Sequence, residues 1–187
     1  NVAFGISVSG SHSLIEHNTI ENFSGDGLRG LGDHCVFQYN VVKNCYDVNA
    51  NHDDGFQSWT RGPKGVGSGE VVGMVLRGNT IITFEDPQQP HRGALQGIGC
   101  FDGMFVDWII ENNVVIVDHY HGITLVQLAQ DSSAGKVLIV HDEPAPMVVL
   151  AEIVSKYGFR FLKSCTHDAP MANIGRPDSA DRTGGSC

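Results

Sequence analysis

The chain has 187 residues, a formal net charge of -9 and a mean hydropathy of -0.08, with 41% hydrophobic residues. These values are typical of a folded protein and exclude a disordered one. Lysines and arginines are scattered, which excludes the basic stripe that nucleic-acid binding needs. No apolar run is long enough to span a bilayer. We therefore expect neither nucleic acid nor a membrane as a partner.

Two short phrases recur along the first two thirds of the chain. The first is a small residue followed by an apolar and then a polar one, and it occurs at 5–7, 27–29, 55–57, 94–96 and 122–124. The second places an aliphatic residue two positions after an asparagine, and it occurs at 15–20, 37–42, 76–81 and 110–115. Both alternate with period two and predict short strands. Because the first phrase begins close to the start of the chain and no initiator methionine precedes it, we expect a fragment.

Repeats of this length, made of strands and turns, are typical of a solenoid whose successive coils cover one another. The apolar residue of the first phrase is expected to face inward, at Ile6, Leu28, Phe56, Leu95 and Ile123. Its two neighbours, the small residue before it and the polar residue after it, are expected to point outward. The unequal spacing between the inward residues requires loops, which the composition places at 60–69 and 85–91. Pro87 and Pro90 exclude a central strand in the second of these.

The asparagines of the second phrase have a predicted structural role. At a tight corner an asparagine tolerates left-handed backbone angles, and stacked amides can hydrogen-bond from coil to coil. The residues concerned are Asn18, Asn40, Asn79 and Asn113. The five cysteines show no paired spacing, so Cys35 and Cys100 are predicted to be inward-facing small apolar residues. If the protein is exported, a disulfide between Cys35 and Cys45 is the alternative.

These repeats resemble those of right-handed parallel β-helix proteins, over residues 2–126. The resemblance implies an all-β fold, a right-handed parallel β-helix of about five coils over residues 1–130. It also implies a polysaccharide as partner, a monomeric state, and an extracellular or periplasmic location in bacteria. Many members of this fold are polysaccharide lyases, some are glycosidases, and others are adhesins.

A different pattern follows Val126. Residues 136–140 predict a buried strand, and residues 144–157 predict a helix that begins after Asp142 and Glu143 and ends at Gly158. This stretch resembles the first strand and helix of response-regulator receiver domains. His141 stands where that family has an acid, and no later strand ends in a phospho-acceptor aspartate, so we expect no receiver activity. Residues 131–162 are thus a receiver-like β-α segment or a cap of the solenoid, and 163–187 an irregular or disordered tail.

Stacking the coils predicts two rows of side chains on the outer surface. One row follows the inward apolar residue and contains Ser7, Arg29, Gln57, Gln96 and Thr124. The other row precedes the small residue and contains Asp26, Asp54, Arg92 beside Gly93, and His121. Neighbouring strands lie about 4.8 Å apart, so such rows can bind a linear polymer. We expect substrate binding by Asp26, Arg29, Gln57, Trp59, Gln96 and Thr124.

The richest segment is 52–59, His-Asp-Asp-Gly-Phe-Gln-Ser-Trp, which can bind a cation, move a proton and stack on a sugar. It resembles the His-x-Asp-Gly-(Phe/Ile)-Gln segment of carbohydrate-directed β-helix proteins, and an Asp-Asp-Gly turn is the competing interpretation. Calcium is a candidate cofactor, with Asp53 and Asp54 as its ligands. His119 and His121 share a strand face and suit a metal pair or proton transfer.

Three functions follow from these residues. A β-eliminating lyase would use Asp54, Arg92, His119 and His121 to bind the uronate carboxylate and transfer protons. A glycoside hydrolase would use Asp26 and Asp54 as its two carboxyl groups. A glycan-binding adhesin or tail-fibre-like solenoid would need only stacking surfaces, such as Trp59, Phe101 or Trp108. The histidine and arginine content favours the lyase.

Overall fold

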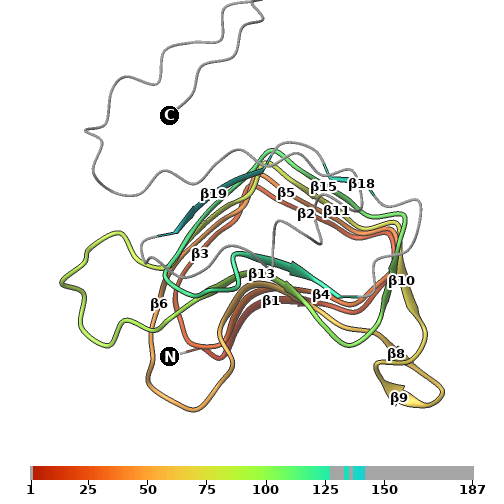
Figure 1. The fold of residues 1–187 in the computed structure, drawn as a ribbon, viewed down its shortest axis with the longest axis horizontal. Coiled ribbons are helices and arrows are strands. Elements are labelled where there is room, and N and C mark those ends of the chain that lie inside the picture. The colour runs from red at the N-terminus through yellow and green to blue at the C-terminus, as the bar shows by residue number, and fades with distance from the viewer. Residues whose placement is uncertain (1, 127–132, 135–136, 142–187) are drawn as a thin grey trace, which may run out of the picture.

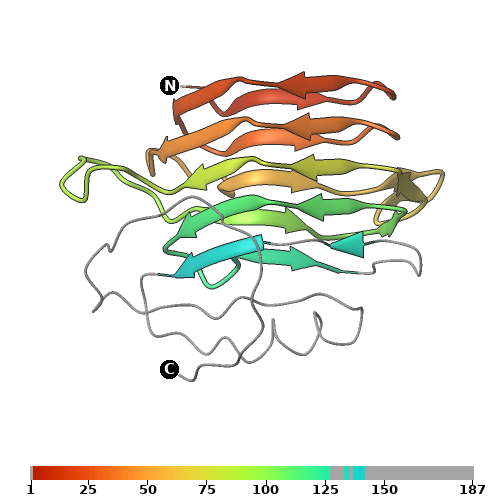
Figure 2. The same cartoon turned by 90° about the horizontal axis from the view of Figure 1, so that it is seen from above.

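The computed structural model describes residues 2–126, 133–134 and 137–141, and the side chains of residues 2–126. These residues form strands, turns and bends, with no helix among them, and so none that could cross a membrane. The chain passes through three parallel sheets in turn (Figure 1). Seen from the side, its successive turns stack one upon another (Figure 2). The coarse prediction of an all-β protein is confirmed.

Each turn of the chain gives one strand to each of the three sheets. The first sheet contains β1 (Phe4–Val8), β4 (Asp26–Gly30), β7 (Asp54–Ser58), β13 (Gln96–Cys100) and β17 (Ile123–Leu125). The second contains β2 (Leu14–Glu16), β5 (Val36–Gln38), β11 (Val75–Arg77), β15 (Ile109–Glu111) and β18 (Ser133–Ala134). The third contains β3 (Thr19–Phe23), β6 (Val41–Cys45), β12 (Thr80–Ile82), β16 (Asn113–Val117) and β19 (Val137–His141).

Smaller pairs of strands occupy the connections. β10 (Glu70–Val72) pairs with β14 (Met104–Val106) in parallel. β8 (Arg61–Gly62) and β9 (Gly65–Val66) form an antiparallel hairpin inside the stretch that composition predicts to be a loop. The proline-containing segment 85–91 holds no strand, as predicted, and projects from the stack in both views (Figures 1 and 2).

The core lies between the three sheets. Phe56 packs edge-on against Phe37, with ring centroids 5.1 Å apart, and against Trp108 at 6.4 Å. Trp108 is 1% exposed and donates its indole N–H to the carbonyl of Val71 at 2.8 Å. It is therefore part of the core, which corrects its prediction as an external stacking surface for sugar. Cys35 and Cys100 are free and fully buried, as predicted, and the buried Cys45 is also a free thiol.

The stacked asparagine amides are confirmed. Each amide donates to the next asparagine's side-chain oxygen at 3.0 Å, from Asn18 to Asn40, then to Asn79 and to Asn113. The same oxygens accept the backbone N–H of the preceding asparagine at 2.9–3.1 Å. The left-handed residue is the one before each asparagine, at His17, Tyr39, Gly78 and Asn112, which corrects the predicted position. The asparagine therefore closes the corner through its amide, while its neighbour makes the bend.

Strand pairing continues beyond the end of the sequence repeats. β18 pairs with β15, and β19 pairs with β16 from Asn113↔Val137 to Val117↔His141. The strand predicted over 136–140 is thus present, and it extends the stack past the boundary expected at residue 130. The predicted helix over 144–157 and the tail over 163–187 lie outside the described residues.

Replacing Asn79 by alanine is expected to lower the free energy of unfolding by about 2–4 kcal/mol, because the change leaves several buried backbone and amide groups unpaired. Asn79 is 4% exposed and bonds to residues of the turns before and after it. Asn18→Ala is the matched control and is expected to cost about 1 kcal/mol or less, since Asn18 has a partner on one side only. Urea denaturation of the two variants measures the difference. Equal losses would show that the ladder does not depend on buried, two-sided bonding.

Candidate functional site

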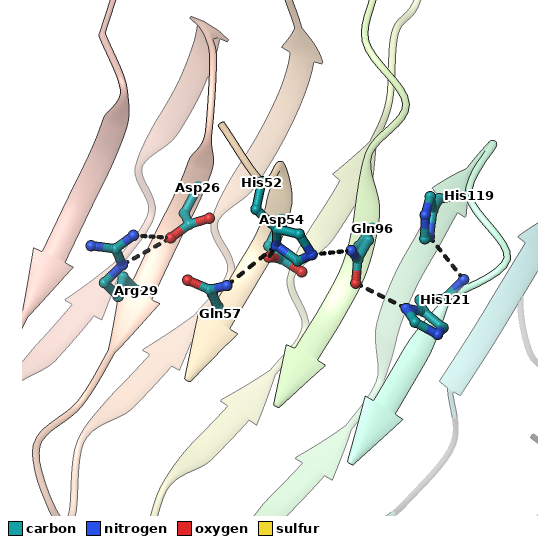
Figure 3. A network of polar contacts seen from close by, with 8 residues as sticks. All are labelled: Asp26, Arg29, His52, Asp54, Gln57, Gln96, His119 and His121. Atoms are coloured by element: carbon teal, nitrogen blue, oxygen red, sulfur yellow. Dashed lines mark hydrogen bonds and ion pairs between the residues drawn. The ribbon is translucent and has the colours of Figure 1, made fainter. Parts of the chain in front are cut away.

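A row of polar side chains lies on the outer face of the sheet formed by β1, β4, β7, β13 and β17 (Figure 3). Strict alternation is broken in these strands, because a glycine and the apolar residue after it both face the core. A Cβ on Gly27 would collide with the buried Val42, while the next residue, Leu28, is 1% exposed. The polar residues on either side of such a pair, Asp26 and Arg29, consequently share the outer face. This corrects the prediction that the small residue points outward.

The register of the fourth strand differs from the predicted one. Ile98, not Leu95, pairs with Phe56 on one side and with Ile123 on the other. Leu95 is 0% exposed and Ile98 is 1% exposed, so either residue satisfies the apolar pattern. The first outer row therefore contains Ser7, Arg29, Gln57, Gly99 and Thr124. The second outer row contains Phe4, Asp26, Asp54, Gln96 and His121. Gln96 thus lies between Asp54 and His121.

Arg29 and Asp26 form an ion pair at one end of the row. The guanidinium donates through Nε at 2.8 Å and through Nη2 to the same carboxylate oxygen, Oδ2. Its central carbon lies 3.8 Å from the ring centroid of Phe4 and 4.7 Å from that of Trp59. Asp26 is only 1% exposed. Burial raises the pKa of Asp26, and the contact with Arg29 opposes that rise.

His52 and Asp54 form the central pair. The imidazole Nδ1 lies 2.7 Å from Asp54 Oδ2, and the side chain of His52 is 56% exposed whereas that of Asp54 is fully buried. Asp54 Oδ1 has no hydrogen-bond partner among the described residues and lies where a Cβ on Gly99 would be. Burial raises the pKa of Asp54 to about 7, and the neighbouring His52 opposes the rise. The carboxyl group is therefore behind the surface, with the imidazole in front of it.

Gln96 connects His52 to His121. Its amide nitrogen lies 2.6 Å from His52 Nε2, and its amide oxygen lies 3.1 Å from His121 Nδ1. The backbone N–H of His121 in turn donates to Nδ1 of His119 at 3.1 Å. Burial lowers the pKa of His121, and the charge of His52 lowers it further. The result is a continuous chain of contacts across three strands, from Asp54 to His121 (Figure 3).

The structure brings together most of the predicted site residues. Asp26, Arg29, Asp54, Gln57, Gln96, His119 and His121 lie along this face, and Trp59 contacts Arg29. Thr124 ends the Gln57 row, beyond Gly99. Arg92 does not join them: it donates to the carbonyl of Pro87 at 2.6 Å and lies 4.5 Å from the ring centroid of Phe84. Its place beside Asp54 depended on the wrong register, and Gln96 occupies that place.

Sequence reasoning left His52 without an assigned role. The His-x-Asp spacing could have identified it, because residues two apart in a strand have their side chains on one face. In the structure His52 contacts Asp54, two residues later. Gln57 Nε2 also approaches His52 Nδ1, at the long distance of 3.4 Å. The recurrence of glycine in the repeats of this chain could have predicted the correct register of the fourth repeat, and with it the position of Gln96. Gly5, Gly27, Gly55 and Gly122 precede the inward residue in four repeats, and Gly97 completes that series where Ala94 does not.

The side chains of Asp53 and Asp54, the predicted calcium ligands, lie beside different glycines. Asp53 Oδ2 lies 3.2 Å from the position of a Cβ on Gly93, whereas Asp54 Oδ1 lies beside Gly99. Burial raises the pKa of Asp53 to about 6. Among the residues that the structure describes, no three or more histidine, cysteine or acidic side chains converge as metal ligands. Calcium binding by Asp53 and Asp54 stays a prediction.

The stability of the protein is expected to fall as pH rises from about 4 to about 7. Asp54 has a raised pKa in the folded state, so the fold binds its proton more tightly than the unfolded chain does, and that advantage disappears as pH passes through 7. Asp54→Asn should flatten this slope, leaving the smaller contribution of Asp53. Glu70→Gln, a change at an exposed acid, is the matched control. Urea unfolding over this pH range tests the sign, and an unchanged slope in Asp54→Asn would contradict it.

Comparison with known proteins finds no relative. No family model, no curated protein and no solved structure matches this chain.

Proposed function

We propose that this chain binds an acidic polysaccharide along the polar row and cleaves it by β-elimination. The observation that carries the proposal is the difference in exposure between the two kinds of titratable group. The imidazole of His52 is 56% exposed, whereas Asp26 and Asp54 are at most 1% exposed. A glycosidase needs two carboxyl groups at the scissile bond, while an elimination needs a base and positive charge. The buried carboxyls therefore favour elimination over hydrolysis.

We further propose that the fold is a right-handed parallel β-helix. Three parallel sheets that receive one strand from each turn, and asparagines stacked at one corner, support this proposal. The handedness follows the strong general preference for right-handed connections between parallel strands. In such a fold the polar row runs along the axis of the stack, which suits an extended polymer.

His121 is the proposed base. Its Nδ1 faces Gln96, so its Nε2 is the nitrogen directed to a substrate, and its lowered pKa keeps the ring neutral. Nε2 takes the proton at C5 of the uronate, the C–H electron pair forms the C4–C5 double bond, and the bond from C4 to the leaving oxygen breaks. The Tyr120 side chain is 62% exposed, and its ring centroid lies 4.0 Å from that of His121. Its hydroxyl donates the proton that the leaving oxygen takes, and is reprotonated from solvent.

The rest of the row provides polymer-binding contacts. Arg29 lies three strands from His121, roughly 14 Å at the usual strand spacing, and so would contact the carboxylate of a different sugar unit. Phe101 lies near both imidazoles, with its ring centroid 6.4 Å from that of His52 and 5.4 Å from that of His121, and can stack on a sugar face. Protonation of Asp54 removes a negative charge from behind this surface. That removal eases the conflict between an acidic protein and a polyanion.

His121→Ala is expected to lower kcat on a polyuronate by at least about 100-fold, because the base is lost. The measurement uses alginate, pectate and related uronates and follows the ultraviolet absorbance of the unsaturated product. His17→Ala, a change at an exposed histidine on another face, is the matched control and should keep full activity.

Two results would overturn the elimination. Glycan binding without new absorbance on any uronate would favour a non-catalytic binding protein. New reducing ends without that absorbance would favour a hydrolase that uses Asp26 and Asp54.

Binding of a polyuronate to His121→Ala should strengthen by about two- to fivefold as pH falls from 8 to 6, because Asp54 takes up a proton in this range. Added salt should weaken the binding, since the contacts are between opposite charges at the protein surface. Calorimetry with a size-defined oligouronate measures both effects. The double variant His121→Ala/Asp54→Asn is the control, and an equal pH dependence in the two proteins would show that Asp54 is not the titrating group.

A further inference from the structure

We infer that Gln96 is a positioning residue, which holds His121 in the tautomer with its proton on Nδ1 and its lone pair on Nε2. The inference rests on the proposed function only for its effect on catalysis. The tautomer itself follows from the order of donors and acceptors along the row.

Gln96 is rigidly placed. Its backbone N–H donates to the carbonyl of Asp53 at 3.0 Å, and the next N–H, of Gly97, donates to the carbonyl of His121 at 3.0 Å. The side chain is 6% exposed, and both ends of its amide meet an imidazole. A buried amide with two engaged ends cannot turn without breaking both hydrogen bonds, so its orientation is fixed by its partners.

The orientation is set at the Asp54 end. Above its pKa of about 7 Asp54 is ionised, and a carboxylate only accepts hydrogen bonds, so the Nδ1 of His52 that lies 2.7 Å away then carries a proton. In the neutral ring Nε2 is then an acceptor, and it lies 2.6 Å from the amide nitrogen of Gln96, which donates. The Gln96 amide oxygen is consequently directed to His121 Nδ1, which must carry a proton to donate to it. The remaining nitrogen of His121, Nε2, keeps its lone pair.

Three described side chains besides Gln96 lie against His121, and they contact it through its ring face or its backbone. His119 accepts the backbone N–H of His121 at Nδ1, and its ring lies edge-on to the ring of His121 with centroids 5.2 Å apart, so neither of these contacts is a hydrogen bond to a ring nitrogen of His121. Phe101 and Tyr120 contact the ring through their own rings. Neutral histidine in water favours the proton on Nε2, which is the opposite tautomer. Removing the Gln96 oxygen should therefore change which nitrogen is protonated.

The test is the imidazole nitrogen NMR spectrum of the full chain labelled with ¹⁵N-histidine, with His121 assigned by its loss in His121→Ala. The wild-type protein should show His121 protonated at Nδ1 above pH 7, and Gln96→Leu should move the proton to Nε2. Gln57→Leu, a change at an amide that approaches His52 but has no recorded contact with His121, should leave the His121 tautomer unchanged. Gln96→Glu keeps an acceptor at the same place and should keep the Nδ1 proton, even if Gln96→Leu fails to fold.

A wild-type signal from the Nε2-protonated ring, or an unchanged tautomer in folded Gln96→Leu, would overturn the inference. If elimination is observed, Gln96→Leu should also lower kcat by about 10-fold or more with little change in KM, as for other residues that orient a catalytic group. The expected tautomers without any elimination would support the role of Gln96 and overturn the proposed function. The two failures are thus distinguishable.

Discussion

Parallel register between neighbouring turns is the constraint on which the site depends. In the sheet that contains β7 and β13, Phe56 pairs with Ile98, which places Gln96 opposite Asp54. A one-residue shift of one strand against its neighbour would turn its side chains to the other face, and the row of polar side chains would no longer form. The register is held from inside by the glycine ahead of each inward residue, since a Cβ on Gly55 or Gly97 would collide with a core side chain. Core packing and surface chemistry therefore come from the same alignment.

Burying the carboxyl of Asp54 costs folding free energy, and its role in the outer row accounts for that cost. Its Oδ1 has no hydrogen-bond partner among the described residues, and burial disfavours its charged form. An apolar residue there would remove this cost, but it would also remove the acceptor that orients His52. Gly99 contributes to the same arrangement, because any side chain there would displace the carboxyl. Two positions on this sheet thus give up packing to hold one imidazole in place.

The sequence predicted the layers of the fold better than the site. Asparagine and glycine recur within the same short phrases, so the strands, the core residues and the amide ladder followed from those phrases. The fourth repeat did not, because both Ala94-Leu95 and Gly97-Ile98 are small-apolar pairs whose apolar member is buried. A shift of three residues then placed Arg92 beside Asp54. The repeat pattern also did not predict how exposed each side chain is, since Trp59 and Trp108 are the same residue type and differ in burial.

Exposure, more than residue type, separates the candidate chemistries on this face. Asp26 and Asp54 have the identity and the neighbouring strands that a pair of hydrolytic carboxyls requires, yet each is held beneath a basic side chain. Under that arrangement a carboxyl would act on a bound polymer only through its partner, by orienting an imidazole or fixing a guanidinium. The exposed groups along the row are then neutral or basic, although the chain as a whole is acidic. A polyanion would therefore meet a local surface whose character is opposite to the protein's net charge.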